Sequence, residues 1–508
     1  ISRRLSDKTP LRRLIGGIEM LNHLKNGANI VYTENGAVTN ASTMSDCLDL
    51  FATIGAIRSA NDQEIIRRFV RAYAENADVA MRILFFGRDV RGGLGERRVF
   101  RVIIKWLAEN KAESLRKNIE LIPEFGRYDD LVSLLGTPCE KDALRTIRKQ
   151  LEADLASDAE VSLLAKWLPS VNASNGETVR KAKRIARYLG MSDAEYRKTL
   201  VKLRKKIRIL ENYLREKDYS FDYSKQPSKA MFKYRKAFLR NDGKRYHAFL
   251  EAVSSGDKQL HVDNLAPYEI VRSALNANQW GFQAGLTAGE KAALDASWDS
   301  LPDFCDNRNA LAVVDTSGSM YCYDNALPAA VALSLGLYFA ERNTGIFRNH
   351  FIEFSSRPQL IEIKGKTFAE RLEYLCTFNK VADTNVEAVF NLILDAAVRN
   401  NVSQEELPET LYLISDMEFN SCVRNVSASN FANAKRRFAE HGYNLPQIVF
   451  WNVASRNSNQ PVTKNEQGVA LVSGCTPRLF SMVASGDISP YSVMMEIIKS
   501  ERYSKISA

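Results

Sequence analysis

The sequence has 508 residues, of which 45% are hydrophobic and 26% are charged; these are the proportions of an ordinary globular protein and exclude long disordered tracts. This length is too great for one hydrophobic core of typical size and predicts two or three domains. The formal net charge of +10, with an isoelectric point near 9.1, favours an anionic partner such as nucleic acid.

The sequence predicts neither a secretion signal nor a membrane span. Residues 1–10 are polar and basic, without the apolar run of a secretory signal. The longest apolar stretch, residues 326–340, is too short to cross a bilayer. The seven cysteines are odd in number and include no CxxC pair, which indicates neither a disulfide framework nor a thiolate zinc site. We therefore expect a cytoplasmic protein with no membrane partner.

Residues 1–300 are predicted to form a helical domain. From about residue 45 onward, apolar residues recur three and four positions apart, as in Ile65, Phe69 and Tyr73, which is the spacing of amphipathic helices. Helices separated by short polar turns indicate stacked helical hairpins, a solenoid of the HEAT-like type. No sequence period repeats clearly.

A glycine-rich segment opens one of these helices. It runs from Phe85 to Phe100 and contains four glycines together with Arg88, Arg91, Arg97 and Arg98. Backbone amides at a helix N-terminus, flanked by arginines, can hold a phosphate group. The alternative is a tight turn between helices, in which the arginines pair with Asp89 and Glu96.

The densest positive charge lies between residues 180 and 208, where twelve Lys and Arg face only two acidic residues. On helices, many of these residues share a face, and tyrosines at 188, 196 and 213 can add base stacking. A solvated helix face is the usual alternative for a charge run, but such faces normally mix signs. The candidate RNA contacts of this segment are Arg180, Lys181, Arg184, Arg187, Lys202, Lys205 and Lys206.

Residues 301–508 have a different pattern, in which short apolar runs alternate with helical segments. This alternation predicts a doubly wound α/β domain with a mainly parallel sheet. The predicted strands are 310–314, 351–354, 411–415, 448–453 and 469–472. The predicted helices are 326–341, 386–399, 430–440 and 491–500.

Oxygen-bearing side chains follow the strands of this domain. Asp315, Ser317 and Ser319 come directly after the first strand, Asp416 follows the third, and Thr384 precedes a helix. Because the carboxyl ends of parallel strands meet at one edge of the sheet, these oxygens are expected to converge there. Such a set suits Mg²⁺ or another hard divalent cation.

The segment from Asp315 to Ser319 has two other interpretations. The segment from Asp315 to Ser319 can be a simple helix N-cap, but that does not account for Thr384 and Asp416. A phosphotransferase aspartate would have a second aspartate two residues on, where Ser317 stands. No catalytic residues are therefore assigned.

The segment from Asp315 to Ser319 resembles the DxSxS signature of the metal-ion-dependent adhesion site (MIDAS) of von Willebrand factor A domains. Thr384 and Asp416 match the family's threonine and second aspartate. The resemblance implies that these residues bind the cation and that one position stays open for an acidic group of a partner. Met417 and Glu418 stand where many members have a small turn.

The helical half resembles the TROVE module of Ro autoantigen proteins, and even more a related, poorly characterised family that joins such a region to an A domain. The likeness lies in residues 89–106 and in residues 122–131, which include Arg127. The resemblance implies a ring of HEAT-like repeats closed by the A domain, which binds small structured or misfolded RNA. Arg88, Arg91, Arg97 and Arg127 are the candidate RNA contacts of these segments.

The sequence thus favours a non-catalytic RNA-binding scaffold of the Ro type, a ribonucleoprotein component with small non-coding or misfolded RNA as its partner. The alternative is a protein-interaction module whose cation captures an acidic side chain of a partner. An enzyme within the helical half is a third and weaker hypothesis.

Overall fold

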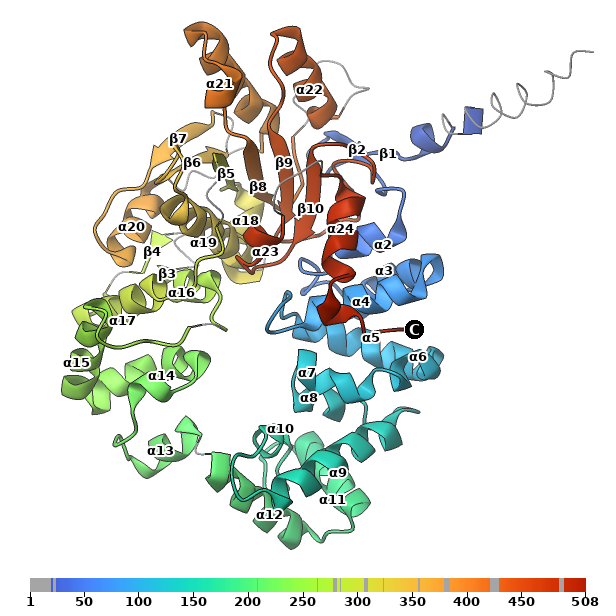
Figure 1. The fold of residues 1–508 in the computed structure, drawn as a ribbon, viewed down its shortest axis with the longest axis vertical. Coiled ribbons are helices and arrows are strands. Elements are labelled where there is room, and N and C mark those ends of the chain that lie inside the picture. Colours follow the sequence, from blue (N-terminus) through green and yellow to red (C-terminus); the bar gives the residue numbers. More distant parts are fainter. Residues whose placement is uncertain are drawn as a thin grey trace, which may run out of the picture.

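The computed structural model describes residues 20–21, 24–207, 209–262, 264–276, 281–283, 285–305, 309–322, 324–354, 357–378, 384–420, 429–483 and 488–508. These residues form an arc of helices followed by an α/β domain (Figure 1). The expected solenoid and doubly wound domain are both confirmed.

A short hairpin precedes the helices. Strands β1 (Ile30–Tyr32) and β2 (Val38–Asn40) pair antiparallel. Isolated bridges join Gly36 to Asn420 and Asn40 to Gln460, so the hairpin lies against the α/β domain. The hairpin was not predicted, because its strands are only three residues long and much of their support comes from residues about 380 to 420 positions away.

The helices of the arc are short and follow one another closely. They are α2 (Asp46–Phe51), α3 (Asp62–Glu75), α4 (Ala77–Arg88), α5 (Arg97–Asn110), α6 (Ala112–Arg116), α7 (Ile122–Phe125), α8 (Tyr128–Val132), α9 (Glu140–Ala156), α10 (Leu164–Trp167), α11 (Gly176–Leu189), α12 (Asp193–Ile207), α13 (Leu210–Glu216), α14 (Ser228–Asn241), α15 (Gly243–Ser254), α16 (Pro267–Ala274) and α17 (Ala288–Asp299). A two-stranded pair, β3 (Leu275–Asn276) and β4 (Gly281–Phe282), lies between the last two.

Helix α3 shows how the sequence specifies these elements. The Asn61 side chain accepts a hydrogen bond from the Glu64 amide and caps the helix N-terminus. Ile65, Phe69 and Ala72 are buried on one face, as their spacing predicts. The arc is therefore built from amphipathic helices that bury one face against their neighbours.

The α/β domain has a six-stranded sheet in the order β10-β9-β8-β5-β6-β7. All neighbouring strands are parallel except for β7, an antiparallel edge strand that was not predicted. The strands are β5 (Ala310–Asp315), β6 (His350–Phe354), β7 (Gln359–Glu362), β8 (Thr410–Ser415), β9 (Gln447–Asn452) and β10 (Val469–Ser473). The helices are α18 (Gly318–Cys322), α19 (Leu327–Arg342), α20 (Phe368–Leu375), α21 (Val386–Asn400), α22 (Asn430–Glu440), α23 (Leu479–Met482) and α24 (Pro490–Ile498).

Alternate residues of the strands face two separate hydrophobic layers. In β5, Ala312 and Val314 pack in the layer with α19, whereas Leu311 and Val313 pack in the layer with α21 and α22. A Cβ at Gly336 would lie 2.3 Å from a methyl of Val314, so glycine lets α19 lie directly on the sheet. The sheet is thus covered on both faces, as is usual for a sheet whose central strands are parallel.

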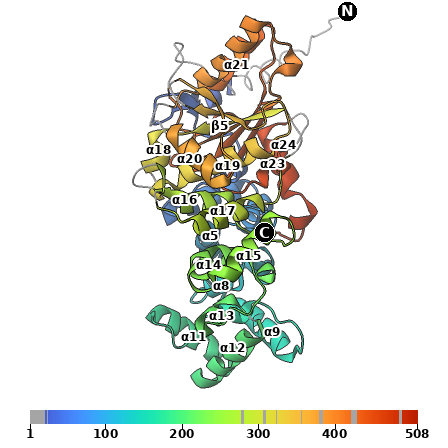
Figure 2. The same cartoon turned by 90° about the vertical axis from the view of Figure 1, so that its left-hand side faces the viewer.

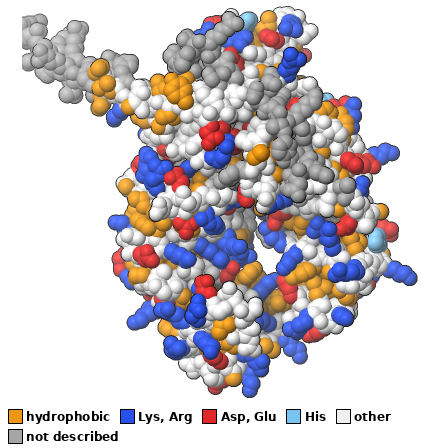
Figure 3. Space-filling view, turned by 180° about the vertical axis from the view of Figure 1, so that it is seen from behind, with side chains coloured by type: hydrophobic (Ala, Val, Ile, Leu, Met, Phe, Trp, Pro, Cys, Tyr) orange, Lys and Arg blue, Asp and Glu red, His pale blue; other side chains and the backbone are white. Residues whose placement is uncertain are grey.

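Both ends of the arc contact the α/β domain and close a ring (Figure 1). At one end, α2 and α4 contact α24; at the other, α16 contacts α19 and α17 contacts α20. Helices α11 and α12 lie at the end of the molecule farthest from the sheet (Figure 2). The molecule is hollowed between the two sides of the arc, with Lys and Arg side chains around the hollow (Figure 3).

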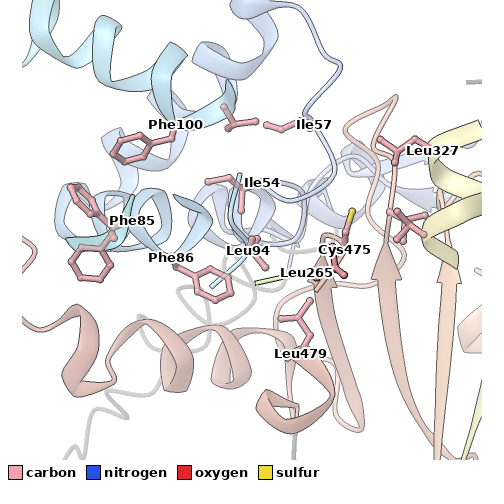
Figure 4. Packing of buried hydrophobic residues seen from close by; sticks show 14 of the residues in the cluster. Ile54, Ile57, Phe85, Phe86, Leu94, Phe100, Leu265, Leu327, Cys475 and Leu479 are labelled. Atoms are coloured by element: carbon pink, nitrogen blue, oxygen red, sulfur yellow. The ribbon is translucent and has the colours of Figure 1, made fainter. Parts of the chain in front are cut away.

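The hydrophobic core continues across the joint between the two parts. Ile54 and Leu94 of the helical part share one cluster with Leu327, Cys475 and Leu479 of the α/β domain (Figure 4). A Cβ on Gly55 would lie 2.6 Å from the Ser473 carbonyl oxygen. The two parts therefore share one continuous core, and their backbones approach closely at Gly55.

The described cysteines are all free thiols; Cys422 lies outside the described residues. No helix within the described ranges has the length and apolarity that a membrane crossing requires.

Candidate cation site and basic surfaces

The predicted cation ligands lie at the carboxyl edge of two adjacent strands. Strands β5 and β8 are parallel neighbours, so Asp315, the last residue of β5, lies beside Ser415 and Asp416. Ser317 lies in the turn that leads from β5 into α18, and Ser319 is the second residue of that helix. The topology therefore brings together residues that are a hundred positions apart.

Hydrogen bonds join four of the five predicted residues into one cluster. Ser317 Oγ and Ser319 Oγ share a hydrogen bond of 3.1 Å, and Ser319 Oγ donates to Asp416 Oδ2 at 2.8 Å. The Ser317 amide donates to Asp315 Oδ1 at 2.9 Å, and Ser415 Oγ donates to Asp315 Oδ2 at 2.6 Å. A simple N-cap would not recruit Asp416.

Thr384 is buried directly before α21. Its carbonyl accepts a hydrogen bond of 2.8 Å from the Asn420 amide, which ties it to the segment after Asp416. Among the described residues, no hydrogen bond connects its hydroxyl to the other four. Its neighbour Asp383 lies outside the described residues.

Ionised Asp315 lies in an unfavourable environment. Asp315 is fully buried. Burial and the nearby charge of Asp416 raise the pKa of Asp315 to about 7, despite the hydrogen bonds from Ser415 and Ser317. A divalent cation would neutralise this repulsion.

The spacing of the oxygens fits a hard divalent cation. Adjacent ligands of an octahedral Mg²⁺ at about 2.1 Å lie about 3.0 Å apart. The oxygen pairs Ser317–Ser319 and Ser319–Asp416 are separated by 3.1 Å and 2.8 Å. In the part of the chain that the structure describes, no group of three or more His, Cys, Asp or Glu could hold a metal by itself, so hydroxyl ligands are essential to such a site.

Arg456 is a member of the site that sequence reasoning missed. Its NH2 group donates to Asp416 Oδ2 at 2.8 Å, and its NH1 group lies 2.8 Å from Glu34 Oε2. Arg456 follows β9, the strand next to β8. Because Arg456 follows a strand of the same sheet, its place at this edge could have been predicted from the sequence. Nothing local in the sequence indicated Glu34.

The glycine-rich loop binds the segment around Arg502 of the same chain. Arg502 donates to both carboxylate oxygens of Asp89, and the Tyr503 hydroxyl donates to Asp89 Oδ2 at 3.0 Å. A Cβ at Gly93 would lie 2.1 Å from the Phe86 carbonyl oxygen. The loop therefore closes the ring, a role that neither sequence interpretation included.

Arg88 is not placed for RNA contact. Its side chain is 1% exposed and forms an ion pair with the buried Asp130 at 2.7 Å. Arg88 therefore lacks the exposed surface that the predicted RNA contact needs, because the residues of α4 around it are packed into the core. Arg91 is exposed and donates to the Glu124 carbonyl oxygen at 2.5 Å.

Arg97 and Arg127 lie close together on a more open surface. Burial and the like charges of Arg97 and Arg88 lower the pKa of Arg127, against the effect of Asp129. The Arg127 guanidinium lies 4.0 Å from the centre of the Trp167 ring. Arg97 also lines a groove of about 510 Å³ whose other walls are Asp62, Ile66, Arg98, Arg101, Val102, Lys105, Trp106 and Glu109.

Some of the predicted RNA contacts on α11 and α12 have a partner within the protein, and others have no ionic partner. Lys181 pairs with Glu177, Arg184 pairs with Glu140, and Lys206 donates to the Ser157 carbonyl oxygen. Within the described residues, no ion pair involves Arg180, Arg187, Lys202 or Lys205, and all four are exposed. Tyr196 is buried and is not available for stacking; Arg208 lies outside the described residues.

Comparisons with known proteins found two family models, a viral relative and a solved structure that resemble this chain. Two models, both described as domains of unknown function, match the chain: DUF2828 at residues 33–149 and 177–307, and DUF7788 at residues 309–500. An uncharacterized protein of Acanthamoeba polyphaga mimivirus is 27% identical over 517 residues, which covers 93% of this chain and 88% of that protein. The crystal structure of the Ro (RSR) protein of Deinococcus radiodurans aligns with 91% of this chain and 100% of its own, with 14% identity and a TM-score of 0.41.

Proposed function

We propose that the chain is a non-catalytic RNA-binding scaffold whose α/β domain binds Mg²⁺ or another divalent cation. Its RNA partners are small non-coding or misfolded RNAs, held through their phosphates by basic surfaces of the helical ring. The free thiols of the described cysteines fit a reducing compartment, and we place the scaffold in the cytoplasm.

The observation that supports RNA binding best is the unpaired positive charge on α11 and α12. Arg180, Arg187, Lys202 and Lys205 are exposed, with no ion pair among the described residues. Cations of a solvated face are usually offset by neighbouring acids. A row of cations without such partners attracts a polyanion such as an RNA backbone.

The groove along α5 offers a second contact for the same ligand. Arg97 and Lys105 are exposed on its walls, and Trp106 is half-buried between them. An indole face beside two cations suits an unpaired base and its flanking phosphates.

The alternative function is a protein-interaction module that uses the cation site. The convergence of Ser317, Ser319 and Asp416 within hydrogen-bond distance supports it. A cation held there, with one open position, would capture a carboxylate of a partner protein.

One binding experiment separates the two functions. The purified chain is treated with RNase until its ultraviolet absorbance ratio is that of protein alone. It is then titrated with a fluorescent RNA hairpin carrying a single-stranded end, and separately with a fluorescent Glu-rich peptide, each with Mg²⁺ and with EDTA. We expect the RNA to bind in both conditions, with affinity falling steeply as salt rises. Absence of RNA binding at low salt, together with Mg²⁺-dependent peptide binding, would establish the alternative instead.

A further inference from the structure

Arg456 forms an ionic bridge between two carboxylates from distant parts of the chain. One is Asp416, which is buried at the cation site, and the other is Glu34, in the turn of the β1–β2 hairpin. Both N···O distances are 2.8 Å. The oxygen of Asp416 that accepts from Arg456 also accepts from Ser319 Oγ, so the guanidinium lies beside the predicted cation position.

The hairpin holds Glu34 firmly in this place. The Glu34 amide donates to Glu418 Oε2 at 2.8 Å, and Thr33 Oγ1 donates to the Phe419 carbonyl oxygen at 2.6 Å. Asn457 Nδ2 contacts both Glu34 Oε1 and Glu418 Oε1 at 3.0 Å. Glu34 is therefore anchored on both its backbone and its side chain to the segments that follow β8 and β9.

Arg456 and a divalent cation would compete for the same carboxylate. A cation bound to Asp416 would repel the guanidinium, since both are positive and both would contact one carboxylate group. The Arg456 side chain is 23% exposed, so it can withdraw without opening the core. Glu34 is 44% exposed and remains available to pair with Arg456 after it leaves Asp416.

We propose that Arg456 is a specificity-determining residue of the cation site: an internal counter-ion that the incoming cation displaces from Asp416 and that Glu34 then retains. This inference rests on the proposed cation site. A monovalent ion would replace one positive charge by another of equal size, whereas a divalent ion adds a net charge. Arg456 thus favours divalent over monovalent ions and lowers the affinity for both.

The proposal is tested by calorimetric titration of the full chain with MgCl₂. Arg456→Gln should bind Mg²⁺ about tenfold more tightly than the wild type, the size expected for removing one nearby positive charge at a partly buried site. Arg456→Lys keeps the charge but cannot bridge two carboxylates with a planar fork, so its affinity should lie between the two.

The Glu34→Gln variant tests whether Glu34 acts by retaining the displaced Arg456 or only through its own negative charge near the cation. It should weaken Mg²⁺ binding severalfold when Arg456 is present, because the displaced guanidinium loses its partner. In the Arg456→Gln background, the same change should have no effect. Arg399→Gln is the matched control, since Arg399 is exposed and lies near the far end of α21, about 20 Å along the helix from Thr384. Circular dichroism and thermal unfolding verify that each variant is folded.

Two kinds of result would contradict the proposal, one against the role of Arg456 and one against the cation site itself. Equal affinity of the wild type and Arg456→Gln, or equal weakening by Glu34→Gln in both backgrounds, would overturn the role of Arg456 and leave the cation site standing. If neither the wild type nor Arg456→Gln binds Mg²⁺, or if Asp315→Ala with Ser317→Ala still binds it, the cation site itself is wrong and this inference falls with it.

Discussion

Arg502 donates to both carboxylate oxygens of Asp89, and Asp89 has no exposed surface. The pair joins the segment after α24 to the glycine-rich loop before α5. Removing the arginine leaves a buried carboxylate without its charged partner. We expect Arg502→Gln to lower the free energy of unfolding by about 2–3 kcal/mol, less than for a fully buried pair because Arg502 is partly exposed. Thermal and urea unfolding measure this.

The control for that variant is Arg215→Gln, which removes an exposed arginine paired with Glu216. Its effect should stay within about 0.5 kcal/mol. Equal effects of the two variants would mean that the Asp89 pair does not stabilise the ring.

The same pair predicts an acid dependence of stability. Burial opposes ionisation of Asp89, but hydrogen bonds from Arg502 and from the backbone at residues 91 and 92 outweigh it and lower the pKa of Asp89. A group with a depressed folded pKa stabilises the protein above its unfolded pKa, about 3.9. This contribution should disappear as the pH falls through the lower folded value. In Arg502→Gln, unfolding measured between pH 2 and 5 should show a shallower acid slope.

In the absence of a cation, Asp315 should give protein stability the opposite pH dependence. Its pKa is raised by burial and by Asp416 to about 7, so its contribution to stability is greatest below its unfolded pKa and is lost as the pH rises toward 7. In EDTA, the melting temperature of Asp315→Asn should therefore exceed that of the wild type by more at pH 8 than at pH 5. Saturating Mg²⁺ should remove or reverse the difference, because the wild-type site then gains a ligand.

Loss of the cation ligands should abolish Mg²⁺ binding without unfolding the chain. Asp315 and Ser317 lie at the edge of the sheet, after the last buried apolar residue of β5. We expect Asp315→Ala with Ser317→Ala to show no heat of Mg²⁺ binding, with an unchanged far-ultraviolet circular dichroism spectrum. Unchanged Mg²⁺ affinity would place the cation elsewhere.

The basic face of α12 should bind RNA through phosphates. Changing Lys202, Lys205 and Lys206 to Gln should weaken the binding of unrelated RNAs about equally, because phosphate contacts carry no sequence information. The RNA affinity should also depend less steeply on salt concentration, because fewer phosphates are neutralised. The control changes Lys229, Lys236 and Lys291 to Gln; these three lysines are paired with acidic residues. If both triple variants bind like the wild type, the α12 face is only a solvated surface.

Replacing a glycine of the glycine-rich loop by alanine should destabilise the protein through a steric clash. In Gly93→Ala, the new Cβ would lie 2.1 Å from the Phe86 carbonyl oxygen, so the loop must shift and the protein should lose about 2 kcal/mol of stability or more. Gly243→Ala, at the first residue of α15 with no atom within 4 Å of the new Cβ, should be neutral or slightly stabilising. Similar melting temperatures for the two variants would contradict the tight packing of the loop.

Local patterns in the sequence determined the elements of both parts. The spacing of apolar residues predicted the amphipathic helices of the arc, and the alternation of strands and helices predicted five of the six strands of the sheet. The motif from Asp315 to Ser319, together with Asp416, was also readable, because the carboxyl ends of neighbouring parallel strands meet at one edge. These features depend on residues close in sequence or on a general rule of topology.

Only the tertiary structure decided which charges are free and which are used internally. Arg88 and Arg97 look alike in the sequence, yet one is buried against Asp130 and the other is exposed in a groove. The bridge from Glu34 through Arg456 to Asp416 spans about 420 positions. No local pattern encodes such contacts, since they arise when ring closure brings the β1–β2 hairpin and the segment around Arg502 against surfaces built by other parts of the chain.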